Sequence, residues 1–239
     1  LALKLRPKTI DDVIGQKHLV GENAPIRNFI NNKRIFSMIL YGNPGIGKTS
    51  IACAIAGSIN EKYRVLNATV NNKKDIEVVI EEAKMYDGIV LIMDEIHRLN
   101  KDKQDILLPH LESGLITLIG LTTSNPYHKI NPAIRSRCQI FELKPLTLDE
   151  VKEGLNRAIK CEDLKGIKIK KDVIEYIAKL SSGDLRSAYN LLEICYYSTS
   201  DKNITMDVVT KINNKPALFA DKDETGHYDL LSAFQKSIR

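Results

Sequence analysis

The chain has 239 residues, of which 43% are hydrophobic and 27% are charged, and its formal net charge at pH 7 is +5. This length suits one α/β domain followed by a smaller one, and no apolar run is long enough to cross a bilayer, so we expect no membrane partner. The positive charge permits nucleic-acid binding without requiring it. The four cysteines are widely spaced and match neither a zinc site nor a disulfide framework, so we expect a cytoplasmic location.

Residues 1–36 are rich in turn signals, and strand and helix patterns alternate from residue 37 to residue 143. We predict strands at 38–41, 63–67, 89–94, 117–122 and 139–143, and helices near 47–59, 74–86, 101–112 and 131–136. Strands separated by single helices indicate an α/β fold with a five-stranded parallel sheet that helices cover on both faces. Ligands of such sheets bind at the carboxyl ends of the strands.

The segment after the first predicted strand, residues 42–49, reads G-N-P-G-I-G-K-T and is a complete phosphate-binding loop. Its glycines allow backbone N–H groups to point at phosphate oxygens, while Lys48 reaches the β- and γ-phosphates and Thr49 binds Mg²⁺. A strand before the loop and a helix after it are the context that this motif requires. The predicted nucleotide-binding residues of the loop are Asn43, Pro44, Gly45, Ile46, Gly47, Lys48, Thr49 and Ser50.

The third predicted strand ends in two carboxylates, Asp94 and Glu95. We expect Asp94 to hold the Mg²⁺ shell and Glu95 to polarise an attacking water, so the two motifs together predict a nucleotide triphosphatase. The run 72–75 matches the guanine-reading N-K-x-D pattern, but it precedes this strand, whereas in GTPases it follows, so ATP is favoured. Residues 94–97 also spell a DExH helicase box, but helices follow instead of a second domain, so His97 is interpreted as a structural or coupling residue.

Three more positions fit an ATPase whose hydrolysis depends on a neighbouring subunit and on the second domain. Asn125 follows the fourth predicted strand and is placed to orient the attacking water. Arg137, in the run S-R-C at the domain edge, suits a neighbouring subunit's γ-phosphate and is favoured over Arg135 as an arginine finger worth about 10³-fold in turnover. Asp184 can cap a later helix, whose first turn carries Arg186 towards the γ-phosphate.

Beyond residue 145 the segments 148–161, 171–181, 184–198 and 205–213 show helical apolar spacing and no strand signals. We therefore predict a nucleotide-binding domain at 1–145, a small all-helical lid at 146–213, and a linker at 214–239 that begins a truncated C-terminal domain. Residues 229–239 read as an amphipathic helix without a cap, and the chain lacks an initiating Met. We expect it to be a fragment of a longer protein.

With these motifs, nearly the whole chain resembles an AAA+ ATPase of the clamp-loader branch. The resemblance implies that the N-terminal segment wraps the adenine and that the run G-D-L-R carries the sensor arginine. It also implies that Asn67 restrains Glu95 until a ligand binds. The additional nucleotide-binding residues that it implies are Arg6, Pro7, Ile14, Gly15, Leu185 and Arg186.

The run D-E-I-H-R-L-N-K at 94–101 and the run at 220–229 narrow the resemblance to the RarA/MgsA recombination-factor ATPases, relatives of the eukaryotic Werner-helicase-interacting protein. This resemblance implies a cytoplasmic, nucleoid-associated ATPase that uses ATP and Mg²⁺ and is stimulated by DNA. It implies action on single-stranded, gapped or forked DNA at stalled replication forks, together with single-stranded-DNA-binding protein. The full-length protein is implied to be a homotetramer, with Arg137 acting in trans.

Two alternatives stay open. The first is a subunit of a sliding-clamp loader, against which the missing zinc-ligand cysteines and the two runs above argue. The second is a nucleotide-dependent scaffold with little hydrolysis, although relatives of that kind usually lack residues that are present here. Lys101 and Lys103, after the Asp94-Glu95 pair, fit a DNA-facing surface and an ordinary solvated surface equally well.

Overall fold

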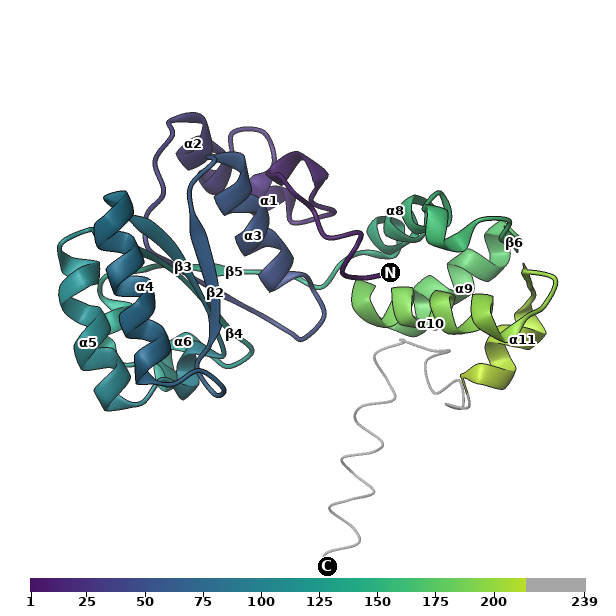
Figure 1. Cartoon of the computed structure of the whole chain (residues 1–239). Coiled ribbons are helices and arrows are strands. Elements are labelled where there is room, and N and C mark those ends of the chain that lie inside the picture. Colours follow the sequence, from purple (N-terminus) through teal and green to yellow (C-terminus); the bar gives the residue numbers. More distant parts are fainter. Residues whose placement is uncertain (214–239) are drawn as a thin grey trace, which may run out of the picture.

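Two domains lie side by side in the computed structural model, which describes residues 1–213 (Figure 1). The first is built on a five-stranded parallel sheet with strand order β2-β3-β4-β1-β5. All five predicted strands are confirmed, with bounds that differ by one residue at most. They are β1 (Met38–Tyr41), β2 (Tyr63–Asn67), β3 (Ile89–Asp94), β4 (Ile116–Thr122) and β5 (Gln139–Glu142).

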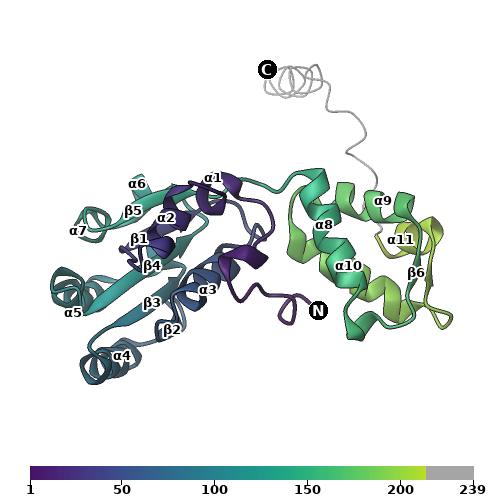
Figure 2. The ribbon, with the colours of Figure 1, turned by 90° about the horizontal axis from the view of Figure 1, so that it is seen from above.

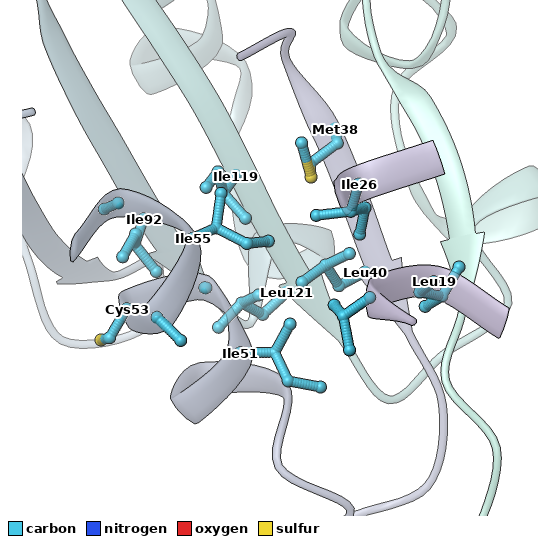
Figure 3. Packing of buried hydrophobic residues seen from close by; sticks show 14 of the residues in the cluster. Leu19, Ile26, Met38, Leu40, Ile51, Cys53, Ile55, Ile92, Ile119 and Leu121 are labelled. Atoms are coloured by element: carbon cyan, nitrogen blue, oxygen red, sulfur yellow. The ribbon is translucent and has the colours of Figure 1, made fainter. Parts of the chain in front are cut away.

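Helices cover both faces of the sheet because the strands are apolar on both faces. In β1, Met38 and Leu40 belong to one buried cluster and Ile39 to another, as the alternation of side chains along a strand requires. The first cluster packs under α3 (Lys48–Ser58) and α2 (Pro25–Asn31), and Figure 3 shows Ile51 and Ile55 of α3 beside Leu121 and Ile119 of β4. The second cluster packs under α4 (Lys73–Tyr86) and α5 (Lys101–Glu112).

The N-terminal segment holds helices where we expected only turns. It forms η1 (Ile10–Asp12), α1 (Lys17–Val20) and α2, and Ile26 of α2 is fully buried. Three short elements follow later strands, namely η2 (Ile96–Arg98), α6 (Pro126–Lys129) and α7 (Pro132–Arg135). The helix predicted near 131–136 is present as α7, whereas η2 and α6 were not predicted, because elements of three or four residues are too short to show helical periodicity.

The second domain is mainly helical, with α8 (Leu148–Ile159), η3 (Glu162–Leu164), α9 (Lys171–Ser181), α10 (Leu185–Ser198) and α11 (Met206–Ile212) around its own core. A capping box of Thr147 and Glu150 starts α8, and the predicted cap of α10 is present, since the Ser187 N–H donates to Asp184 Oδ1 at 2.9 Å. The expectation of an all-helical domain was wrong in one detail. β6 (Lys168–Ile169) and β7 (Asn203–Ile204) pair in parallel, and two-residue strands are too short to show alternation.

The N-terminal segment runs between the two domains (Figure 2). Leu5 packs against the core of the helical domain, and the Arg157 Nη1 of α8 donates to the Asp12 carbonyl at 2.7 Å. Gln16 is buried and binds the link between the domains twice, since its Nε2 donates to the Lys144 carbonyl at 2.6 Å and its Oε1 accepts from the Lys144 N–H at 3.0 Å. The segment therefore sets how the two domains meet.

No helix in residues 1–213 combines the length and the apolar character needed to cross a membrane. The predicted linker at 214–239, the run at 220–229 and the predicted helix at 229–239 lie outside the described residues.

The sheet core yields a stability prediction. Leu40 is fully buried in the central part of the sheet, so Leu40→Ala should lower the free energy of unfolding by about 2–5 kcal/mol through lost burial and a new cavity. Val78 is 59% exposed on α4, so Val78→Ala should change it by about 0.5 kcal/mol or less. Urea denaturation of both variants measures the difference, and equal effects would contradict this description of the core.

Candidate functional site

A cavity of about 560 Å³ lies between the two domains at the carboxyl end of the sheet. Its size is that of a typical small-molecule site. The N-terminal segment, the loop after β1, the end of β3 and the helix α10 each contribute to its wall. The predicted site residues that line it are Arg6, Pro7, Ile14, Pro44, Gly45, Ile46, Gly47, Lys48, Thr49, Ser50, Asp94, Glu95, Leu185 and Arg186.

Four predicted site residues do not line this cavity. The Asn43 carbonyl accepts a bond from Lys48, and Gly15 has φ +70°, where a Cβ would lie 2.5 Å from Leu146 Cδ2. Asn125 Oδ1 accepts from the Tyr127 N–H at 3.0 Å and caps α6, while Thr123 of the same loop does line the cavity. Arg137, the fourth, lies between α7 and β5, the outermost strand on that side of the sheet.

The loop after β1 curls through glycines with positive φ. Gly42 has φ +149°, and a Cβ there would lie only 2.6 Å from the Leu143 carbonyl oxygen, so the position requires glycine. Gly47, at φ +95°, directly precedes α3. The N-terminus of α3 therefore faces the cavity, and its free N–H groups and dipole favour an anion there.

Lys48 is held inside this loop. Its ammonium donates to the Gly42 carbonyl at 2.8 Å and to the Asn43 carbonyl at 2.7 Å. Burial lowers the pKa of Lys48, and the neighbouring Asp94 and Glu95 carboxylates act in the opposite direction. A buried ammonium whose partners are two backbone carbonyls gains from an anionic ligand that binds beside it.

The two carboxylates at the end of β3 have different surroundings. Asp94 Oδ1 accepts from the Glu95 N–H at 3.0 Å, and Glu95 has a left-handed backbone with φ 52°. The Glu95 carboxylate contacts an imidazole, with 3.3 Å between Glu95 Oε2 and His97 Nε2. No hydrogen bond joins Asn67 to Glu95 among the contacts of the described residues, and the Asn67 Oδ1 accepts from the Thr69 N–H at 2.9 Å.

Thr49 and Asp94 fit the predicted Mg²⁺ site. Both line the cavity, one offering a hydroxyl oxygen and the other a carboxylate oxygen. Oxygen donors suit Mg²⁺, which keeps its other positions for phosphate and water. The oxygen donors of the cavity therefore fit a Mg²⁺ ion bound together with a nucleotide.

The helical domain reaches the phosphate-binding loop through the start of α10. A Cβ on Gly45 would lie 2.0 Å from the Asp184 Cγ, so only a glycine allows this carboxylate to pack against the loop. Arg186, two residues later, lines the cavity. Sequence patterns missed three other residues of this wall, Arg157, Tyr189 and Asn190, because no motif marks them. Burial raises the pKa of Tyr189 to about 12.

Arg137 lies away from the cavity of its own chain. Its guanidinium pairs with Glu112 at the end of α5 and donates to the Ala133 carbonyl at 2.5 Å. The competing arginine, Arg135, donates to the Tyr127 carbonyl within its own loop. Both arginines are thus held by contacts within their own chain.

The two lysines after the Asp94-Glu95 pair differ. The Lys103 ammonium donates to the Ala68 carbonyl at 2.9 Å and to the Asn71 carbonyl at 2.6 Å, so it ties α5 to the loop after β2. Lys101 is exposed. Lys103 therefore makes a structural contact, which neither a DNA-facing surface nor an ordinary solvated surface had predicted.

Comparison with known proteins gives two family matches. Residues 38–146 match the ATPase family associated with various cellular activities (AAA), and residues 162–239 match the AAA C-terminal domain. In fold the chain is similar to the RuvB Holliday junction branch migration motor of Thermotoga maritima, with a TM-score of 0.73 and 30% identity over 87% of this chain and 71% of that chain.

Relatives in sequence include the replication-associated recombination protein A of Bacillus subtilis, which is 52% identical over 100% of this chain and 59% of that protein. The protein of the same name from Haemophilus influenzae is 35% identical over 100% of this chain and 56% of its own length. The ATPase WRNIP1 of Dictyostelium discoideum is 33% identical over 100% of this chain and 30% of its own length. The chain therefore spans little more than half of these bacterial relatives.

The surroundings of Lys48 generate a binding prediction. Lys48→Ala should weaken the binding of a fluorescent ATP analogue about 10- to 100-fold, because charge-assisted bonds to phosphate worth about 1.5–3 kcal/mol are lost. Lys103→Ala is the matched control, since that ammonium also binds two backbone carbonyls but lies outside the cavity wall. Fluorescence titration measures both affinities, and equal losses would show that Lys48 acts only on the fold.

Proposed function

The chain belongs to the RarA family of AAA+ ATPases, and from that premise we propose that its cavity binds and hydrolyses ATP in order to act on DNA. The observation that carries this proposal is the convergence of Lys48, Thr49, Asp94, Glu95 and Arg186 on one cavity. They come from the loop after β1, the end of β3 and the second domain, yet together they supply the parts that phosphoryl transfer to water requires.

Each group then has a role in the reaction. Lys48 leaves its two carbonyl partners for the β- and γ-phosphates, and Thr49 and Asp94 would hold Mg²⁺, which neutralises phosphate charge when bound. Glu95 polarises the attacking water and accepts its proton. Arg186 binds the γ-phosphate from the second domain, which links closure of the two domains to the state of the nucleotide.

Adenine binding falls to the N-terminal segment. Arg6, Pro7 and Ile14 line the same cavity as the phosphate-binding loop, and Tyr189 of α10 lines it too. Gly15 supports this wall indirectly, because it lets the segment pass close to Leu146 at the link between the domains. Asn125 is proposed to orient the attacking water from the loop after β4.

Partners and location are proposed from the family. The names of the relatives concern replication-associated recombination, which supports DNA as the partner, and the net charge of +5 is compatible with it. We propose a cytoplasmic, nucleoid-associated homotetramer in the full-length form. It acts on single-stranded, gapped or forked DNA at stalled forks together with single-stranded-DNA-binding protein.

The first experiment measures ATP turnover of the full-length protein with and without gapped or forked DNA. Glu95→Gln should still bind ATP but lower turnover by about 10²- to 10⁴-fold, because the water loses its general base. Glu77→Gln, an exposed glutamate of α4, serves as the control. Turnover that DNA raises and Glu95→Gln removes is the expected result. Wild-type turnover in Glu95→Gln would refute the assigned role, and turnover indifferent to every DNA would refute the DNA proposal.

A second experiment tests whether Arg137 serves a neighbour. Arg137→Ala should leave ATP affinity unchanged and lower turnover about 10³-fold, since the finger stabilises charge only in the transition state. Arg135→Ala is the matched control, because Arg135 ends α7 two residues before Arg137 and also donates to a backbone carbonyl. Mixing Arg137→Ala with Lys48→Ala subunits should restore part of the activity, because each supplies what the other lacks. A mixture as inactive as its components would contradict action in trans.

A further inference from the structure

A chain of polar contacts connects the Glu95 carboxylate to the loop after β4. His97 Nε2 lies 3.3 Å from Glu95 Oε2, and His97 Nδ1 lies 2.9 Å from Thr122 Oγ1. The Ser124 N–H in turn donates to Thr122 Oγ1 at 3.0 Å. The predicted function uses neither His97 nor Thr122, and yet both stand directly behind the group that polarises water.

The hydrogen-bond donors and acceptors of these groups favour one distribution of protons. An ionised carboxylate only accepts hydrogen bonds, so His97 Nε2 must carry the proton that faces Glu95. The Thr122 hydroxyl has one proton and two acceptors within reach, His97 Nδ1 at 2.9 Å and the Ser124 carbonyl at 3.4 Å, and the shorter contact favours donation to Nδ1, which leaves the imidazole neutral. The Thr122 oxygen keeps a lone pair for the Ser124 N–H. All donors therefore point in one direction, from the loop after β4 towards Glu95.

The base of this chain is rigid. Thr122 is fully buried at the end of β4, and its carbonyl accepts from the Gly42 N–H at the start of the phosphate-binding loop, at 3.3 Å. Its hydroxyl therefore has a fixed position relative to that loop.

The imidazole is brought to Thr122 by close packing of η2 on β4. A Cβ on Gly120 would lie 2.6 Å from Ile96 Cδ1, so this glycine lets η2 approach the strand. The His97 side chain is only 10% exposed, whereas that of Glu95 is 35% exposed and lines the cavity. The buried partner is thus fixed and the carboxylate faces the ligand.

We infer that His97 is a positioning residue for hydrolysis: its neutral imidazole, oriented by Thr122, aims the Glu95 carboxylate at the attacking water. This inference rests on the proposed ATPase function. It assigns to His97 the contact with Glu95 that sequence resemblance assigned to Asn67. A base that a third group orients, as His97 orients Glu95 here, loses less entropy at the moment of proton transfer.

Kinetics of the full-length protein test the inference. His97→Ala should lower kcat about 10- to 100-fold, the usual effect of losing an orienting partner, with KM for ATP within about threefold of wild type. His97→Gln keeps an N–H that can reach Glu95 and should recover part of the lost kcat. Thr122→Val should lower kcat more than Thr122→Ser, which keeps the hydroxyl. His110→Gln on α5 is the control histidine.

Coupling to Glu95 separates positioning from a merely structural role. In a Glu95→Gln background, His97→Ala should lower turnover less than about twofold further, because its effect passes through the carboxylate. A full additional loss, or a wild-type kcat in His97→Ala, overturns the inference. A raised kcat overturns it too, since His97 would then restrain Glu95. The proposed ATPase function is tested independently of His97, by comparing the turnover of the wild type with that of Glu95→Gln.

A structural measurement decides the inference even if the protein does not turn over. ¹⁵N NMR of the nucleotide-free chain at pH 8 reports the protonation of each imidazole nitrogen, and the signal missing in His97→Gln identifies His97. We expect a neutral ring with the proton on Nε2, and Thr122→Val should shift its Nδ1 resonance. A proton on Nδ1, or on both nitrogens, overturns the inference.

Discussion

The parallel pairing of β3, β4 and β1 is the constraint on which the rest of the structure depends. Their register sets Tyr41 beside Thr122 and Met93 beside Gly120, so the three strands end at one edge of the sheet. Both faces are covered by apolar clusters, and a shift of one residue would turn each buried side chain to the wrong face. The burial that stabilises the sheet therefore also fixes where the phosphate-binding loop and Asp94 meet.

The second domain contributes to the cavity because Gly45 has no side chain and so allows the start of α10 to approach the phosphate-binding loop. Asp184 packs against Gly45 of the phosphate-binding loop and at the same time caps α10, so the helix that carries Arg186 starts on the loop itself. A negative carboxylate at this point is repelled by a phosphate in the loop, whereas Arg186 is attracted by it. The start of α10 thus carries two opposite charges, and a phosphate in the loop would act on them in opposite directions.

Much of the fold was predictable from the sequence, and the exceptions have physical reasons. The strands were found because long apolar runs such as 89–93 have no alternative to a buried sheet. The helix α1 and the pair β6–β7 are too short for periodicity to reveal, whereas α2, which is as long as the predicted α11, was missed because it starts at Pro25 in a run of turn signals. Of the site, a contiguous motif such as 42–49 was readable. The contact of His97 with Glu95 was not, because it depends on how closely η2 approaches Gly120.

The pairing of Arg137 with Glu112 is compatible with the proposed role of Arg137 as an arginine finger, because it holds the side chain without burying it. The two side chains are 34% and 54% exposed, and ion pairs in water contribute only about 0–1 kcal/mol. Such a pair keeps the guanidinium extended at the domain edge without trapping it. A triphosphate carries several charges and lies in a partly closed cavity, where electrostatic attraction is stronger than at the surface. For the proposed role in trans, Arg137 would exchange Glu112 for the γ-phosphate of a second subunit, and the weakness of the exposed ion pair keeps the cost of that exchange low.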